Sequence, residues 1–102
     1  MKKKENGFIG KSVVVRADKA GVFVGKLKSK NGTEVVLTNC RRLWYWDGAA
    51  SISQIAIDGV SKPDTCKFPE SVSEILIMGV IEIIPMCNKA VKSINAIPAW
   101  KL

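Results

Sequence analysis

The sequence predicts a mainly β, α+β fold: a small, strongly bent five-stranded sheet or partial barrel with a short inserted helix and a C-terminal helix. Short runs rich in β-branched residues follow one another with turn residues between them. Two other segments show the helical spacing of apolar residues. Bending a sheet shut needs bulges and flexible positions, and three glycines lie where the strands would bend: Gly10, Gly25 and Gly79.

Length and composition indicate one domain with a true core. The chain has 102 residues, of which 47% are hydrophobic. Residues 1–6 are charged and polar and are expected to form a flexible basic N-terminus, which leaves 7–102 as a single β-rich domain. The formal net charge of +7 favours an anionic partner. No signal-peptide pattern or bilayer-length apolar run is present, so we expect a cytoplasmic protein that does not bind membranes.

The N-terminal half predicts three strands joined by tight turns. The first run is rich in valine and ends at the turn residues 18–21. One face of this strand should be buried and the other mixed. Gly25 inside the second run indicates a bend or bulge, and Asn31-Gly32 after it is typical of a short hairpin. The predicted strands cover residues 8–17, residues 22–27 and a third run that begins at 34–37 and continues as far as Trp46.

The C-terminal half predicts a helix, two strands and a second helix. Ser51 and Gln54 have the spacing of a capping box and Gly59 fits a C-terminal cap, so a helix is expected over about 51–58. After a proline-containing connector, residues 74–84 predict either two strands joined at Gly79 by a very short turn or one sharply bent strand, and residues 87–95 predict the last helix.

Basic and aromatic residues near the start of the inserted helix form the candidate ligand site. In a strand, Arg42, Trp44 and Trp46 would share one face, which can stack a base and hold a phosphate. The N–H groups at the start of the helix would also favour an anion. The candidate ligand-binding residues are Arg41, Arg42, Trp44, Trp46, Gly48, Ala49, Ser51 and Gln54.

The same residues have a purely structural interpretation. Large aromatic side chains are buried more often than they bind ligands, so Trp44 and Trp46 could belong to the core or to an interface. Arg41 and Arg42 would then be solvated, and Gln54 would cap the helix rather than contact a base edge. The sequence leaves both interpretations open.

The residue types present exclude several kinds of chemistry. The chain has no histidine, which removes Ser-His and Cys-His catalysis and histidine-ligated metal sites. There is no P-loop or G-x-G-x-x-G motif, and the carboxylates show no motif spacing. The three cysteines, Cys40, Cys66 and Cys87, have no C-x-x-C spacing and indicate small buried side chains in a reducing compartment. We therefore expect no enzymatic activity, no metal and no cofactor.

Part of the chain resembles Sm-like domains. Residues 10–16 and 21–37 are similar to their first half, with a glycine in the second strand, and residues 75–85 are similar to the strand–glycine–strand that ends the barrel. SH3-like barrels share much of this pattern. The chain lacks the usual leading helix, inserts residues 41–69 and lacks the acidic residue and asparagine of the RNA pocket. The resemblance implies an SH3/Sm-like partial barrel and ring formation more than RNA binding.

A second resemblance is to small phage proteins with an R-R-x-W-x-W-x-G-A-x-S segment followed by a short helix and E-I-I-P. Arg41 to Ser51 and Glu82 to Pro85 carry it. By class analogy, such proteins resemble anti-defence proteins that sequester nucleotide immune signals, such as cyclic ADP-ribose isomers or cyclic oligonucleotides. If a phage encodes the chain, its location would be the host-cell cytoplasm.

The resulting expectation is a phage-type anti-defence protein that sequesters a small anionic nucleotide signal without catalysis. We also expect a homo-oligomer, because pairing between chains protects exposed edge strands. One alternative is an inhibitor that contacts a host protein through an apolar patch around Trp46 or Trp100. The other is an Sm-like oligomer that binds single-stranded RNA along a phosphate track formed by Arg16, Lys26, Lys28 and Lys30.

Overall fold

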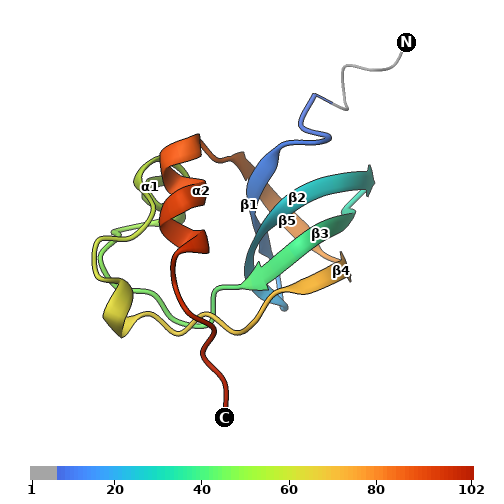
Figure 1. Ribbon diagram of the computed structural model, residues 1–102. Helices are drawn as coiled ribbons and strands as arrows, with labels where there is room; N and C mark the ends of the chain where they lie inside the picture. The colour runs from blue at the N-terminus through green and yellow to red at the C-terminus, as the bar shows by residue number, and fades with distance from the viewer. Residues whose placement is uncertain (1–6) are drawn as a thin grey trace.

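The computed structural model describes residues 7–102, which form a five-stranded antiparallel sheet and two α-helices (Figure 1). The expected flexible N-terminus over 1–6 lies outside the described residues. In chain order, the elements are β1 (Ser12–Ala17), β2 (Gly21–Asn31), β3 (Glu34–Arg42), α1 (Ile52–Asp58), a 3-10 turn (Pro63–Thr65), β4 (Val72–Ile77), β5 (Val80–Pro85) and α2 (Asn88–Asn95).

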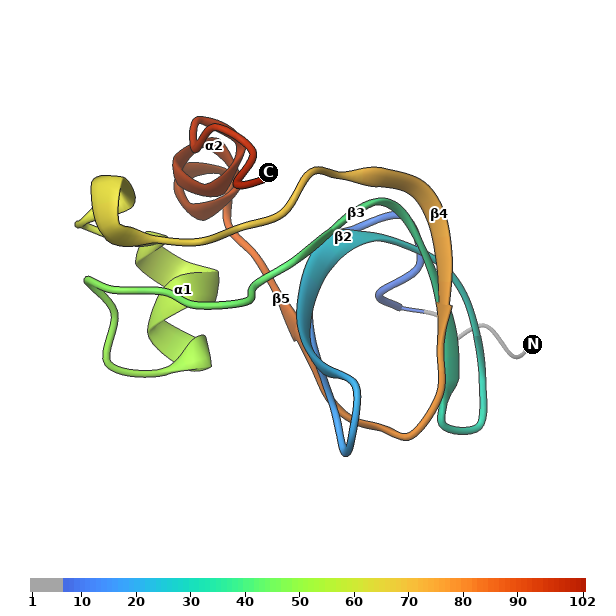
Figure 2. The same ribbon diagram turned by 90° about the horizontal axis from the view of Figure 1, so that it is seen from below.

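The sheet is strongly bent and has two free edges. Its strand order is β4-β3-β2-β1-β5, and all neighbouring strands are antiparallel. Figure 2 shows the sheet curling around an interior, with β4 and β5 at its edges. The mainly β, α+β class and the bent five-stranded sheet predicted from the sequence are therefore confirmed, and the sheet does not close into a barrel.

The bend in the middle of the sheet is centred on Gly25. The pairing register between β2 and β3 shifts there, so that Asn39 and Cys40 of β3 oppose one residue of β2. A Cβ atom on Gly25 would lie 3.0 Å from the carbonyl oxygen of Thr38, so a side chain would push the strands apart. Asn39 has a φ of 49°, in the left-handed region that asparagine tolerates better than most residues. The bulge predicted at Gly25 is thus confirmed.

Two apolar clusters pack on opposite faces of the sheet. Val13 and Val15 of β1 belong to the cluster inside the bend, and Val14 belongs to the cluster between the outer face and the helices. All three are fully buried. The expectation of one buried and one mixed face on this strand is confirmed. On the outer face, which α1 and α2 cover from one side of the sheet in Figure 1, Val14 is buried, Ser12 is half-buried and Arg16 is exposed.

Most predicted elements lie where the sequence places them. The two helices are confirmed within one residue at each end, and residues 74–84 form two strands joined at Gly79, which has a φ of 77°. The third strand is shorter than predicted, since it ends at Arg42 and beyond it Tyr45 forms only an isolated bridge with Lys67. In the part of the chain that the structure describes, no helix has the length and apolar character needed to span a bilayer.

Candidate functional site

Arg41, the first predicted ligand-binding residue, is buried and its guanidinium group binds backbone carbonyls. Its Nε atom donates to the oxygen of Pro69 at 2.9 Å, Nη1 to Ile94 at 2.9 Å and Nη2 to Phe68 at 3.2 Å. The side chain is 6% exposed and lies over the Phe68 ring. Burial lowers the pKa of Arg41, but guanidinium groups stay protonated in proteins. This arrangement connects segments of the fold. Arg41 thus has a structural role, but the expectation that it would then be solvated was wrong, because its guanidinium group finds its hydrogen-bond partners inside the protein.

Arg42 lies on the other side of β3 and is only partly exposed. Its guanidinium carbon is 4.5 Å from the centroid of the Phe23 ring, within the range of a cation–π contact. Nη1 donates a 2.7 Å hydrogen bond to the carbonyl of Ala20 in the β1–β2 turn. The two arginines therefore do not converge on one ligand, because β3 directs them to opposite faces of the sheet.

The polar groups at the start of α1 are used in the hydrogen bonds of a capping box. The Gln54 backbone N–H donates to Ser51 Oγ at 3.3 Å, and Gln54 Oε1 accepts from the Ala50 N–H at 2.8 Å. Gly48 has a φ of 88° and accepts a hydrogen bond from the Ser61 N–H. Ala49 packs against the outer core cluster. These predicted site residues have clear structural roles, and α1 is too short to be taken as an anion site by itself.

The two tryptophans of the predicted site are placed differently. Trp46 is half-buried against the outer core cluster. Trp44 is 64% exposed, and its ring lies nearly parallel to that of Trp100, with an interplanar angle of 8° and centroids 6.5 Å apart. Trp100 is itself 43% exposed. We call Trp44 and Trp100 the indole platform.

Backbone hydrogen bonds hold the indole platform in place. The Trp100 N–H donates to the Phe68 carbonyl at 2.9 Å, and Tyr45, next to Trp44, exchanges two backbone bonds with Lys67. Lys67 Nζ lies 5.6 Å from the centroid of the Trp100 ring. The two stacked, exposed indoles thus lie beside a cation. The connector between α1 and β4 joins the segments that carry the two tryptophans.

A family model for a domain of unknown function, DUF6948, matches residues 10–94. The chain belongs to the DUF6948 family. No curated protein matches it. The matched range of the DUF6948 domain covers the sheet and nearly all of α2, and it includes every predicted site residue and Lys67. Trp100 lies beyond the matched range, so the platform joins one residue inside the DUF6948 match to one outside it.

Trp100 and the neighbouring Lys67 are absent from the predicted site. The sequence places Trp100 only in an apolar patch that would contact a host protein. Nothing in the local sequence around Lys67 distinguishes it from the other lysines of this DUF6948 chain. The fold brings both residues close to Trp44, from which they are distant in the sequence. The only signal in the sequence was therefore a tryptophan near the C-terminal end.

The predicted RNA track is largely neutralised in the DUF6948 fold. Arg16 and Lys28 each form an ion pair with a glutamate on another strand, with N–O distances of 3.3 and 2.6 Å. Lys30 donates to a backbone carbonyl. Within residues 7–102, neither Lys26 nor Lys30 takes part in an ion pair, and Lys26 lines a polar groove against α2. The four side chains do not form a row of free cations.

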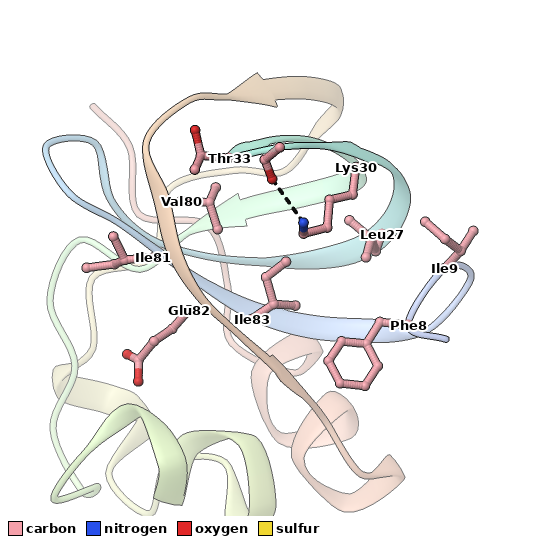
Figure 3. A pocket seen from close by; sticks show the side chains of 10 residues that line it. Phe8, Ile9, Leu27, Lys30, Thr33, Val80, Ile81, Glu82 and Ile83 are labelled. Atoms are coloured by element: carbon pink, nitrogen blue, oxygen red, sulfur yellow. Dashed lines mark hydrogen bonds between the residues drawn. The ribbon is translucent and has the colours of Figure 1, made fainter. Parts of the chain in front are cut away.

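A cavity of about 420 Å³ lies between β5 and the β2–β3 hairpin (Figure 3). Phe8, Ile9, Leu27 and Ile83 give it an apolar lining, and its nearest ammonium, on Lys30, is bonded to the carbonyl of Gly32. Such a lining offers a phosphate few free donors. The indole platform is therefore the better candidate for a nucleotide. Among the described residues, no group of three His, Cys, Asp or Glu side chains could hold a metal ion.

Proposed function

We propose that this DUF6948 protein binds the base and phosphate of a nucleotide-type ligand on the indole platform, without catalysis. The observation that carries the proposal is the pair of exposed, parallel indoles at Trp44 and Trp100 with the Lys67 ammonium beside them. Every nucleobase has a π face, and stacking one base on an aromatic side chain contributes about 1–3 kcal/mol. A lysine next to the stacked base suits the attached phosphate.

Exposure of the platform supports a binding role over a purely structural one. Tryptophan side chains bury a large apolar area when they pack in a core, and here most of the Trp44 ring remains in water. Backbone bonds hold the segments that carry the two rings. An ordered but exposed aromatic surface loses little conformational freedom when a ligand stacks on it.

Free nucleotides and single-stranded nucleic acids share this chemistry but differ in the enclosure that they need. A small nucleotide signal that is to be sequestered needs walls on several sides, since ligand pockets bury most of their ligand. The platform supplies one wall, and in the homo-oligomer that we propose, a second copy would supply another. Single-stranded RNA, the second candidate, needs no enclosure, because successive bases stack on open aromatic surfaces.

Calorimetric titration of the purified protein tests the proposal. The probes are cyclic ADP-ribose, cyclic dinucleotides and short RNA oligonucleotides, each at two salt concentrations. We expect at least one probe to bind, and Trp44→Ala and Trp100→Ala to weaken its binding about tenfold or more. Lys67→Gln should weaken it less. Phe8→Ala, which removes an exposed aromatic at a different cavity, and Lys19→Gln in the β1–β2 turn are matched controls.

The outcomes distinguish a small nucleotide from single-stranded RNA as the ligand. Binding of a small nucleotide, together with native mass spectrometry showing one ligand per subunit or dimer, would support sequestration. Binding of RNA alone, with affinity that falls steeply as salt rises, would support the strand-binding form. If no probe binds, or if both tryptophan variants bind as tightly as the natural chain, the platform is not a nucleotide site.

A further inference from the structure

A polar groove of about 220 Å³ lies between the outer face of the sheet and α2. Its lining comes from six segments: β1, β2, β3, the residues before β4, the link between β5 and α2, and α2 itself. Arg41 is buried, whereas Lys26 and the two asparagines are exposed, so Arg41 lies at the floor and the others lie nearer the rim. The polar lining residues are Ser12, Lys26, Asn39, Arg41, Ser71 and Asn95.

The ionisable residues that line this groove are both cations. Arg41 and Lys26 take part in none of the ion pairs between described residues. A guanidinium has five N–H groups, and the three carbonyl bonds of Arg41 use three of them, which leaves two. A buried charge is normally paired with an opposite charge, but the partners of Arg41 here are neutral carbonyls. The groove therefore carries a positive charge that its own lining does not balance.

A left-handed backbone conformation at Asn39 is a further feature of this groove. Its left-handed conformation arises at the bulge opposite Gly25, and Asn39 is one of the residues that line the groove. Non-glycine residues in this conformation are uncommon, and they occur often where a side chain must be directed to a particular place. Asn39 and Asn95 bring side-chain N–H donors from β3 and α2 to one groove, and Ser12 and Ser71 bring hydroxyl groups.

We infer that this groove binds a small oxyanion, such as inorganic phosphate or the phosphate or carboxylate group of a small metabolite. The site offers two cations, amide and hydroxyl donors and no carboxylate, which is the donor set that oxyanions require. Its volume of about 220 Å³ admits a phosphate with a small substituent, below the size range of most ligand pockets. The inference does not rest on the indole platform, whose residues are not part of the groove lining.

Titration with inorganic phosphate, followed by amide shifts in ¹⁵N-correlated NMR spectra, tests the inference. Sodium chloride keeps the ionic strength constant across the titration. We expect saturable shifts at the groove residues and their neighbours. Lys26→Gln should weaken phosphate binding about tenfold, because it removes a charge without disturbing a bond within the fold. Asn39→Gly, which suits the left-handed backbone and removes only the amide, should weaken binding by a smaller factor.

Lys19→Gln is the matched control, since it removes the same charge from the β1–β2 turn and should leave phosphate affinity unchanged. Trp44→Ala should also leave it unchanged, so failure of the nucleotide proposal and failure of this one can be told apart. The inference is overturned if phosphate causes no saturable shifts in the groove. It is equally overturned if Lys26→Gln and Lys19→Gln weaken binding by the same factor.

Discussion

Arg41 and Ile94 are joined by a 2.9 Å hydrogen bond from the Nη1 atom of the guanidinium to the carbonyl oxygen. This bond connects β3 to the last turn of α2, and the other nitrogens of the same group hold the connector that precedes β4. One side chain thus joins three segments of the fold. Arg41, one of two adjacent arginines in the sequence, therefore mainly connects segments within the fold.

Replacing Arg41 with methionine should lower the free energy of unfolding by about 3 kcal/mol or more. The change keeps an unbranched side chain but removes three hydrogen bonds donated by a charged group, and each such bond contributes about 1.5–3 kcal/mol. Urea denaturation measures the effect. Arg42→Met is the control: it removes one exposed hydrogen bond and a contact with Phe23, so it should cost about 1 kcal/mol. Equal losses of unfolding free energy in the two variants would contradict this structural role of Arg41.

Ser51→Ala should destabilise the domain by about 1 kcal/mol without changing nucleotide affinity. Ser51 caps α1 by accepting from the Gln54 N–H, and loss of such a cap has a cost of this size. Gln54→Ala removes the reciprocal bond to the Ala50 N–H and should have a smaller effect. Thermal unfolding and calorimetric titration, made on the same variants, separate stability from binding. A large loss of affinity with unchanged stability would return these residues to the ligand site.

Gly48→Ala should destabilise the domain more than Gly21→Ala does. Both glycines have positive φ, at 88° and 103°. A Cβ on Gly48 would lie 2.5 Å from the backbone nitrogen of Lys62, whereas a Cβ on Gly21 would meet no atom within 4 Å. Gly21→Ala therefore reports backbone strain alone, about 1–2 kcal/mol, and Gly48→Ala adds a steric term of about 1–3 kcal/mol. Similar midpoints in urea for the two variants would show that the Gly48 loop can shift freely.

Stability should fall at high pH because of Cys40. Burial raises the pKa of this thiol from 9.0 to about 12, although the nearby Arg42 charge opposes the shift. Above about pH 9 the unfolded chain loses this proton while the folded chain keeps it, so the unfolded state binds fewer protons. The free energy of unfolding then decreases as pH rises toward 12, by up to about 1.4 kcal/mol per pH unit.

Denaturation curves between pH 8 and 11 check the effect of Cys40. Lysines also titrate in this range, so the informative quantity is the difference between the natural chain and Cys40→Ala. The variant should be less stable at pH 8 and should lose less stability as pH rises. Parallel curves for the two proteins would mean that Cys40 does not contribute to the pH dependence.

Local patterns predicted the fold well, whereas the site depends on contacts between distant parts of the chain. The helix at Ser51 follows from a few adjacent residues and is confirmed. At Gly79 the structure shows two strands joined by a short turn, which is one of the two arrangements that the sequence leaves open. The bonds of Arg41 reach residues 27, 28 and 53 positions away, so its burial had no local signal. The same reason explains why Trp100 was not placed beside Trp44.

The burial of the three β1 valines, on both faces of the sheet, has a consequence for how the domain opens. Val13 and Val15 face one apolar cluster and Val14 faces the other, while β2 and β5 flank the strand on either side. Water can reach the middle of β1 only if both clusters and both neighbouring strands give way together. The amides of these valines should therefore exchange with solvent only through global unfolding, which makes β1 the part of the chain that couples sheet and helices into one cooperative unit.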